Sequence, residues 1–109
     1  MKVIKVNRDF TVGLYKNIKI NHLANIHLRS NEQITFISKK NREYDFVKKN
    51  WGYYATPSIN GRLKIFKFRC CLVECQLKKK KFIFVVYKEK TEQLKKYLKN
   101  EKLKILFWI

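Results

Sequence analysis

The 109-residue sequence is short of glycine, proline and cysteine, and each shortage excludes a class of function. Three isolated glycines match neither the Walker loop nor the dinucleotide-binding pattern. The three cysteines, Cys70, Cys71 and Cys75, form an odd, local group that makes a poor disulfide framework and lacks the usual Cys-x-x-Cys zinc spacing. We therefore expect no cofactor and no metal. Cys71 and Cys75 are interpreted as small core residues, in preference to a zinc site or a redox-responsive Cys70-Cys71 pair.

Groups that perform acid–base or nucleophilic chemistry are also scarce, with eight acidic residues and two histidines. On a strand, His22 and His27 would lie on opposite faces and could not share a metal. Glu43 and Asp45 would share a face and could serve as general acid and base, but a solvent-exposed face is the favoured interpretation. No catalytic residue is assigned, and a binding function is favoured over an enzyme.

Long apolar runs are absent as well. The longest, Phe82–Tyr87, falls far short of the roughly 20 residues that a membrane helix needs. No basic start followed by an apolar stretch and a small-residue cleavage site opens the chain. These observations predict no transmembrane segment and a location in the reducing cytoplasm.

What the sequence does contain is positive charge, with a net value of +18. Such a charge attracts polyanions, including nucleic acid and phosphorylated ligands. The basic residues are 21 lysines and only 5 arginines, however, and arginine is the residue that favours bidentate recognition of phosphates and bases. Lysine, asparagine and isoleucine are abundant together, which is typical of an AT-rich coding sequence. Base composition is therefore favoured as the main source of the charge, and nonspecific contacts with nucleic-acid phosphates are the alternative.

A hydrophobic fraction of 46% is sufficient for a core, so we predict a single domain over residues 1–109. Alternating apolar and polar residues predict an α+β fold with a mostly antiparallel curled sheet or small half-barrel of six to eight strands and one C-terminal helix. A short first strand is expected to end at a turn over Asn7–Asp9. Gln33–Ser38 is predicted to be a strand that follows a turn.

The second half is predicted from its turn signals and periodicity. Asn60-Gly61 is typical of a type I′ hairpin turn before a strand over Arg62–Arg69. Phe82–Tyr87 is apolar throughout and is expected at the centre of the sheet. Lys90–Glu101 has helical spacing, with Thr91 as the expected N-cap. Leu103–Ile109 is then predicted to return as a strand beside Phe82–Tyr87.

The stretch Phe46–Leu63 is the best candidate for a binding surface. It gathers the only proline, two of the three glycines and a cluster of aromatic and basic residues. Such rings can stack on bases or sugars while the cations hold phosphate, although the same rings could instead fill the core. The predicted ligand-binding residues are Lys48, Lys49, Trp51, Tyr53, Tyr54, Asn60 and Arg62.

Three short sequence motifs carry a family resemblance: NEQITF (Asn31–Phe36), EYDFV (Glu43–Val47) and KNWGYYATPSINGRL (Lys49–Leu63). The chain resembles a small uncharacterised bacterial protein family that is often encoded among surface-polysaccharide and nucleotide-sugar genes. The resemblance covers most of the chain, and the YATPS-NGRL motif is its most specific part. It implies a biosynthetic context and no catalytic residues.

Two hypotheses about function follow. The first is a non-catalytic accessory or binding protein of surface-polysaccharide or nucleotide-sugar biosynthesis, with a sugar, a nucleotide-sugar, another phosphorylated ligand or a glycan-biosynthesis enzyme as its partner. The alternative is a small basic protein that binds RNA or single-stranded nucleic acid, which the charge and the aromatic residues favour. A small isomerase or lyase that uses Glu43, Asp45 or Tyr54 is a third interpretation, and it requires a deep pocket beneath Trp51.

Overall fold

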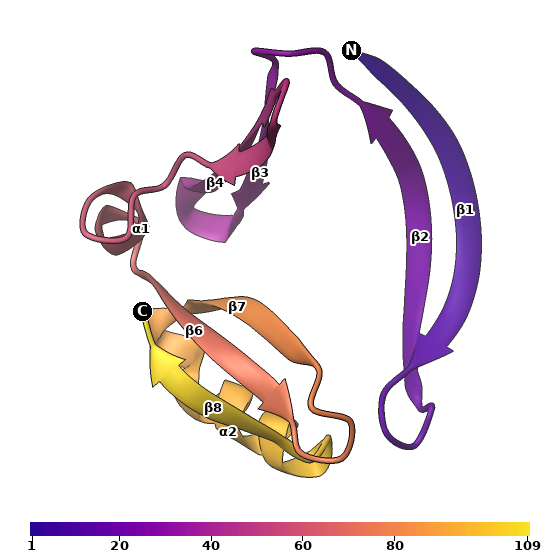
Figure 1. Ribbon diagram of the computed structural model, residues 1–109, viewed down its shortest axis with the longest axis vertical. Helices are drawn as coiled ribbons and strands as arrows, with labels where there is room; N and C mark the ends of the chain where they lie inside the picture. The colour runs from indigo at the N-terminus through magenta and orange to yellow at the C-terminus, as the bar shows by residue number, and fades with distance from the viewer. The chain divides into compact units, whose positions relative to one another are not determined.

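The computed structural model describes residues 1–109 and has an α+β fold, as predicted. Eight strands pair in antiparallel fashion in three sheets that do not close into a barrel, and the main helix is near the C-terminus (Figure 1). The chain folds into two compact units, Met1–Pro57 and Ser58–Ile109. A single domain over residues 1–109 stays a prediction. None of the helices is long and apolar enough to cross a membrane.

The first unit begins with a long hairpin of β1 (Lys2–Val12) and β2 (Ile18–His27). The predicted turn over Asn7–Asp9 is wrong, because β1 continues through it. The register with β2 shifts between Lys5 and Arg8, and Asn7 within this irregularity has φ 54°. A β-bulge accommodates such a residue without ending the strand.

A three-stranded sheet in the order β3-β4-β5 completes the first unit. Its strands are β3 (Gln33–Ser38), with the bounds that the sequence predicts, β4 (Arg42–Lys49) and β5 (Gly52–Ala55). A short 3₁₀ turn joins β3 to β4, and a two-residue turn, Asn50 and Trp51, joins β4 to β5. β5 lies at the edge of this sheet, which suits a strand that ends two residues before Pro57.

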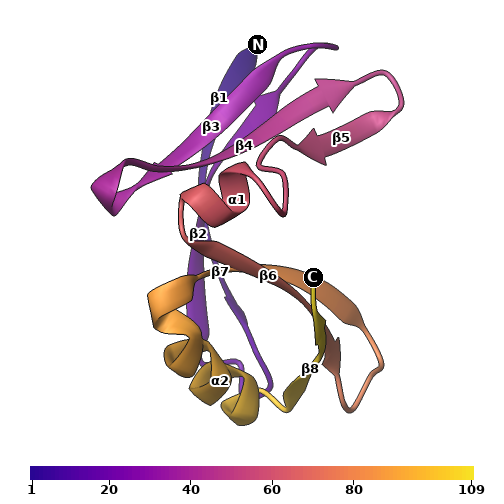
Figure 2. The same ribbon diagram turned by 90° about the vertical axis from the view of Figure 1, so that its left-hand side faces the viewer.

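The second unit contains a second three-stranded sheet with a helix on one face (Figure 2). Its elements are α1 (Arg62–Ile65), β6 (Phe68–Cys75), β7 (Lys81–Tyr87), α2 (Thr91–Asn100) and β8 (Leu103–Trp108). The strand order is β7-β6-β8, so the predicted central position of Phe82–Tyr87 is wrong. The central strand is β6, and β8 pairs with β6 instead of returning beside β7.

The predicted hairpin at Asn60-Gly61 is also wrong, because Arg62–Ile65 is helical. A type I′ turn needs positive φ at both central residues, whereas Gly61 has φ −124°. Ser58 organises the segment instead: its hydroxyl oxygen accepts the Arg62 N–H at 3.2 Å. A Cβ on Gly61 would approach the Ser58 Oγ to 2.2 Å, so a larger residue here would displace the hydroxyl that accepts the Arg62 N–H.

The core of the second unit lies between the sheet and α2. Cys71 and Val73 on β6 are fully buried, and Leu98 on α2 is 4% exposed. Partly buried apolar residues pack against these three: Phe84, Leu94, Leu103, Ile105 and Trp108. Leu94 and Leu98 therefore hold α2 against the sheet, whereas Tyr97 on the same helix is 41% exposed.

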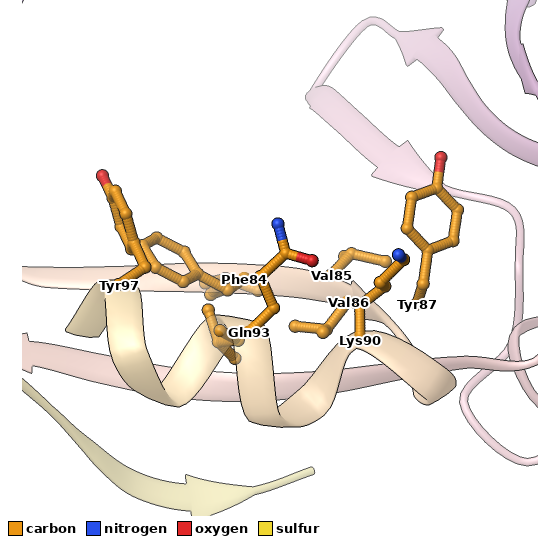
Figure 3. Close-up of a pocket in the computed structure, with 9 residues that line it drawn as sticks. Phe84, Val85, Val86, Tyr87, Lys90, Gln93 and Tyr97 are labelled. Atoms are coloured by element: carbon orange, nitrogen blue, oxygen red, sulfur yellow. The ribbon is translucent and has the colours of Figure 1, made fainter. Parts of the chain in front are cut away.

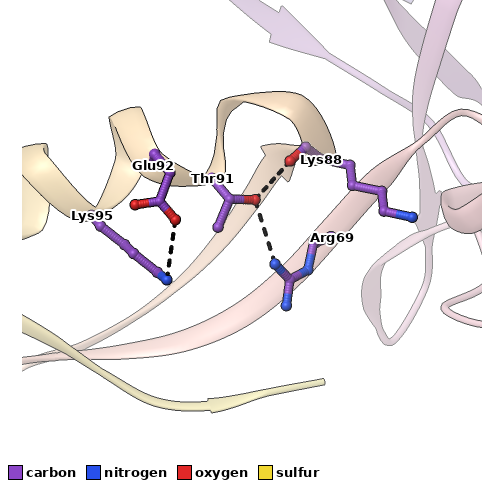
Figure 4. A network of polar contacts seen from close by, with 5 residues as sticks. All are labelled: Arg69, Lys88, Thr91, Glu92 and Lys95. Atoms are coloured by element: carbon purple, nitrogen blue, oxygen red, sulfur yellow. Dashed lines mark hydrogen bonds and ion pairs between the residues drawn. The ribbon is translucent and has the colours of Figure 1, made fainter.

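The start of α2 differs from the prediction. Thr91 is not the N-cap; its hydroxyl donates to the Lys88 carbonyl at 2.7 Å and lies 3.4 Å from Arg69 Nη1 (Figure 4). The Arg69 guanidinium also lies 3.6 Å from the centroid of the Trp108 ring. Arg69 therefore ties the first turn of α2 and the end of β8 to the central strand.

Candidate functional site

The predicted aromatic and basic residues of the first unit lie on the β4–β5 hairpin. The register places Lys49 opposite Gly52 and Lys48 opposite Tyr53, so the intervening turn carries Trp51 to the tip. Trp51 is 71% exposed, Tyr53 63% and Tyr54 43%. The alternative that these rings fill the core is therefore excluded by their exposure.

Alternation along the strands divides these residues between two faces. Tyr54 lies opposite Val47 and Tyr53 lies opposite Lys48, and neighbouring strand residues point to opposite faces. One face carries Lys49 and Tyr54 next to the Trp51 turn, and we call these three residues the Trp51 surface. The other face carries Lys48 and Tyr53. All five residues were predicted to form one surface, but adjacent residues of a strand point to opposite faces and cannot share one.

The Trp51 surface presents a pair of parallel rings. The centroids of the Trp51 and Tyr54 rings are 5.9 Å apart with an interplanar angle of 16°, which is a stacked arrangement. The Lys49 ammonium donates a hydrogen bond to Asn31 Oδ1, and this bond holds its flexible side chain in place. Two apolar ring faces thus lie next to a positioned cation on an exposed hairpin.

The opposite face holds a cation–π pair. The Lys48 Nζ lies 5.2 Å from the centroid of the Tyr53 ring and donates to the Lys49 carbonyl at 2.5 Å. Because the ammonium is engaged with both groups, Lys48 orders the hairpin. Because Lys48 lies on the face opposite the Trp51–Tyr54 ring pair, we assign it a smaller part in ligand contact than Lys49.

Asn60 and Arg62 belong to the second unit. Asn60 lies in the turn before α1, and Arg62 is the first residue of α1. The Arg62 guanidinium carbon lies 5.2 Å from the centroid of the Phe66 ring. That both residues share a ligand with the Trp51 surface stays a prediction.

The predicted solvent-exposed face for the two carboxylates is wrong at Asp45, which is only 2% exposed. Its carboxylate accepts hydrogen bonds from the Thr35 hydroxyl at 2.8 Å and the Thr56 hydroxyl at 2.5 Å. The Thr56 N–H also donates to the Asp45 carbonyl at 3.1 Å. These bonds join β3, β4 and the segment after β5, so Asp45 has a structural role. Trp51 lies exposed at the tip of the hairpin, and the isomerase or lyase interpretation stays untested.

Of the two cysteines predicted as core residues, Cys71 belongs to the core and Cys75 is only partly buried. Cys70 and Cys71 are buried, and Cys75 is partly buried. Burial raises the pKa of both the Cys70 and the Cys71 thiol, which disfavours the reactive thiolate. No group of three or more histidine, cysteine or acidic residues could hold a metal ion.

A second feature was missed at the sequence level: an open groove of about 590 Å³ between β7 and α2, which we call the β7–α2 groove. It is lined by Ile83, Phe84, Val85, Val86 and Tyr87 from β7 and by Lys90, Gln93, Leu94 and Tyr97 from α2. The Phe84 and Tyr97 rings lie together at one end, and Lys90 lies towards the other (Figure 3). The apolar run of β7 could have indicated an apolar groove. Because this run was predicted to lie at the centre of the sheet, with both edges paired, no groove was predicted beside it.

Comparison with known proteins identifies no relatives: no family model, no curated protein and no solved structure matches the chain.

Proposed function

We propose that the protein is a non-catalytic accessory protein that binds a nucleotide-sugar, or another phosphorylated sugar ligand, for surface-polysaccharide biosynthesis. The observation that carries this proposal is the exposed, stacked Trp51–Tyr54 pair next to Lys49. The sequence motifs around Trp51 support the biosynthetic context. An enzyme of the same biosynthesis is the protein partner that this context implies.

The chemistry of the Trp51 surface fits this ligand class. An exposed aromatic face stacks on a base or on the apolar face of a sugar, and base stacking contributes about 1–3 kcal/mol. A lysine ammonium adds a point charge for a phosphate without fixing its orientation. Modest affinity with little geometric specificity follows, as suits a protein that holds a ligand and leaves it unchanged.

Three free thiols, two of them buried, support a reducing location, and we place the protein in the cytoplasm. A structural disulfide would be expected in a small protein adapted to an oxidising compartment.

Calorimetric titration with UDP-glucose tests the proposal. We expect Trp51→Ala to weaken binding about tenfold, because one stacking face is lost. Lys49→Ala should weaken binding several-fold. Tyr15→Ala is the matched control, because Tyr15 is a 66% exposed aromatic residue outside the Trp51 surface. Wild-type affinity in Trp51→Ala, or an equal loss in Tyr15→Ala, would contradict the proposal.

A second candidate function, binding of single-stranded nucleic acid, is favoured by the charge of +18 and the exposed lysines 78–81 at the β6–β7 turn and the start of β7. Salt separates the two functions. Nucleic-acid binding through six to ten phosphates weakens by about 10³–10⁵ between about 50 and 200 mM salt. A nucleotide-sugar engages few phosphates, so its affinity should change only several-fold. A steep salt dependence with an oligothymidylate, unaffected by Trp51→Ala, would favour nucleic acid.

A further inference from the structure

We propose that the β7–α2 groove is a second binding site, separate from the Trp51 surface, and that it takes an extended acidic peptide of a partner protein by strand addition to β7. The groove lies wholly within the second unit. Its two walls are different secondary-structure elements: one is the edge strand β7 and the other is the helix α2.

The lining of the groove shows that it follows the edge of β7. Five consecutive residues of this strand, Ile83 to Tyr87, line the groove. Successive side chains of a strand point to opposite faces, so a cavity confined to one face would contact only alternate residues. Contact with all five indicates a groove along the backbone edge.

An edge strand specifies the kind of occupant. The strand order β7-β6-β8 leaves the outer edge of β7 without a neighbouring strand. Such an edge presents backbone N–H and C=O groups that an extended peptide can satisfy, while pockets beside the edge select alternate side chains. Here Phe84, Leu94 and Tyr97 supply an apolar wall for those side chains.

Charge selects an acidic peptide. Lys90 lines the groove and Lys88 lies just beyond the end of β7, whereas Lys81, at the start of β7, forms an ion pair with Glu74 at 3.5 Å. The second unit has fifteen basic residues and four acidic residues, a net charge of +11. Carboxylates on the peptide would therefore be attracted most strongly at the Lys90 end of the groove, within a unit that is positive overall (Figure 3).

The same lysines argue against a second copy of this chain as the occupant. Antiparallel pairing of two β7 strands would bring lysines 78–81 of one copy next to Lys88 and Lys90 of the other. Parallel pairing would align each lysine with its equivalent. Both arrangements juxtapose like charges, which is how natural edge strands avoid self-association.

The test is fluorescence polarisation with a labelled octapeptide that alternates valine and glutamate. We expect binding that weakens at least tenfold when every glutamate is replaced by glutamine, and also when alternate backbone nitrogens are methylated. Methylation removes donors to the β7 edge and leaves the charge unchanged, so it distinguishes strand addition from nonspecific attraction.

Protein variants give a matched charge comparison. Lys90→Glu and Lys96→Glu both lie on exposed positions of the α2 region and change the net charge equally, but only Lys90 lines the groove. We expect at least a fivefold loss of affinity for Lys90→Glu and less than a twofold loss for Lys96→Glu. Circular dichroism of both variants confirms that they fold.

Four outcomes would overturn the proposal: no peptide binding, equal affinity for the methylated peptide, equal effects of the two charge reversals, or a dimer in sedimentation that the peptide dissociates. The last result would assign the β7 edge to a second copy. Because Trp51→Ala should leave peptide binding unchanged, failure here is distinguishable from failure of the proposed nucleotide-sugar function.

Discussion

Leu98→Ala should destabilise the second unit strongly, because Leu98 is the most buried residue of α2 and holds the helix on the sheet. Its side chain is 4% exposed and packs in one cluster with Cys71 and Val73. The substitution removes roughly three methylene-sized groups at about 0.8 kcal/mol each. A residual cavity adds to this loss, and measured Leu→Ala costs are about 2–5 kcal/mol. We expect a loss of about 3 kcal/mol.

Urea unfolding measures this loss in a background that isolates one fluorophore. The chain has two tryptophans, and Trp108 packs against the same cluster as Leu98. Trp51→Phe removes the exposed indole, so that the remaining fluorescence reports on the second unit alone. Stability of a whole domain is only about 5–15 kcal/mol, so a 3 kcal/mol loss shifts the midpoint clearly.

Leu77→Ala is the matched control, because Leu77 is a 65% exposed leucine in the turn after β6. The same chemical deletion there should cost less than about 0.5 kcal/mol. A loss below about 1 kcal/mol for Leu98→Ala, or equal losses in the two variants, would refute the assignment of the core between α2 and the sheet.

Three further predictions follow from burial and backbone conformation. At pH 8, DTNB should modify one thiol per chain rapidly, and Cys75→Ser should abolish this phase, because burial raises the pKa of the other two thiols. Asp45→Ala should cost about 1–3 kcal/mol in urea unfolding, because Asp45 is buried and the change removes the acceptor of two hydroxyl hydrogen bonds. Asp9→Ala, at an exposed ion pair, should cost less than about 0.5 kcal/mol. Lys102→Gly should stabilise the chain by about 0.5–1 kcal/mol, since Lys102 has φ 57° after α2. Lys104→Gly, within β8, should destabilise it by a similar amount.

Elements with a clear period between strong turn signals could be predicted from the sequence. β3 alternates apolar and polar residues between two polar turns, and its observed bounds are those predicted. The helix over Thr91–Asn100 was likewise marked by leucines at helical spacing. In both cases the local pattern and the tertiary environment favour the same structure.

Predictions failed where tertiary partners decide the outcome. A run of apolar residues such as β7 does not reveal whether its edge is paired, because the position of a strand in a sheet depends on its neighbours. Asn60-Gly61 failed for a local reason, since the Ser58 side chain offers a competing hydrogen bond to the backbone. A four-residue helix such as α1 is also too short to show a period.

The candidate site was predicted in part. The segment that carries Trp51 was identified from its composition, and its rings are exposed. That Tyr53 and Tyr54 point to opposite faces could have been inferred from their adjacency on a strand. The stacking of Tyr54 on Trp51 could not, because it depends on the length and path of the turn.

The abundance of lysine has structural consequences that do not require a polyanion. With only three glycines in the chain, of which Gly13 and Gly52 have positive φ, eight further positive-φ positions are occupied by other residues, all of them asparagine or lysine. Asparagine tolerates this conformation well, but lysine has no such advantage. Lysines therefore stand at turns such as Lys79 and Lys102 at some cost in stability, and they bound the open edge of β7 where like charge opposes self-pairing. A net charge of +18 is thus compatible with a protein whose specific contacts are made by rings and backbone. The Lys102→Gly variant tests the structural interpretation of the lysines at turns. A gain in stability would show that lysine at this turn reflects composition and not selection for stability.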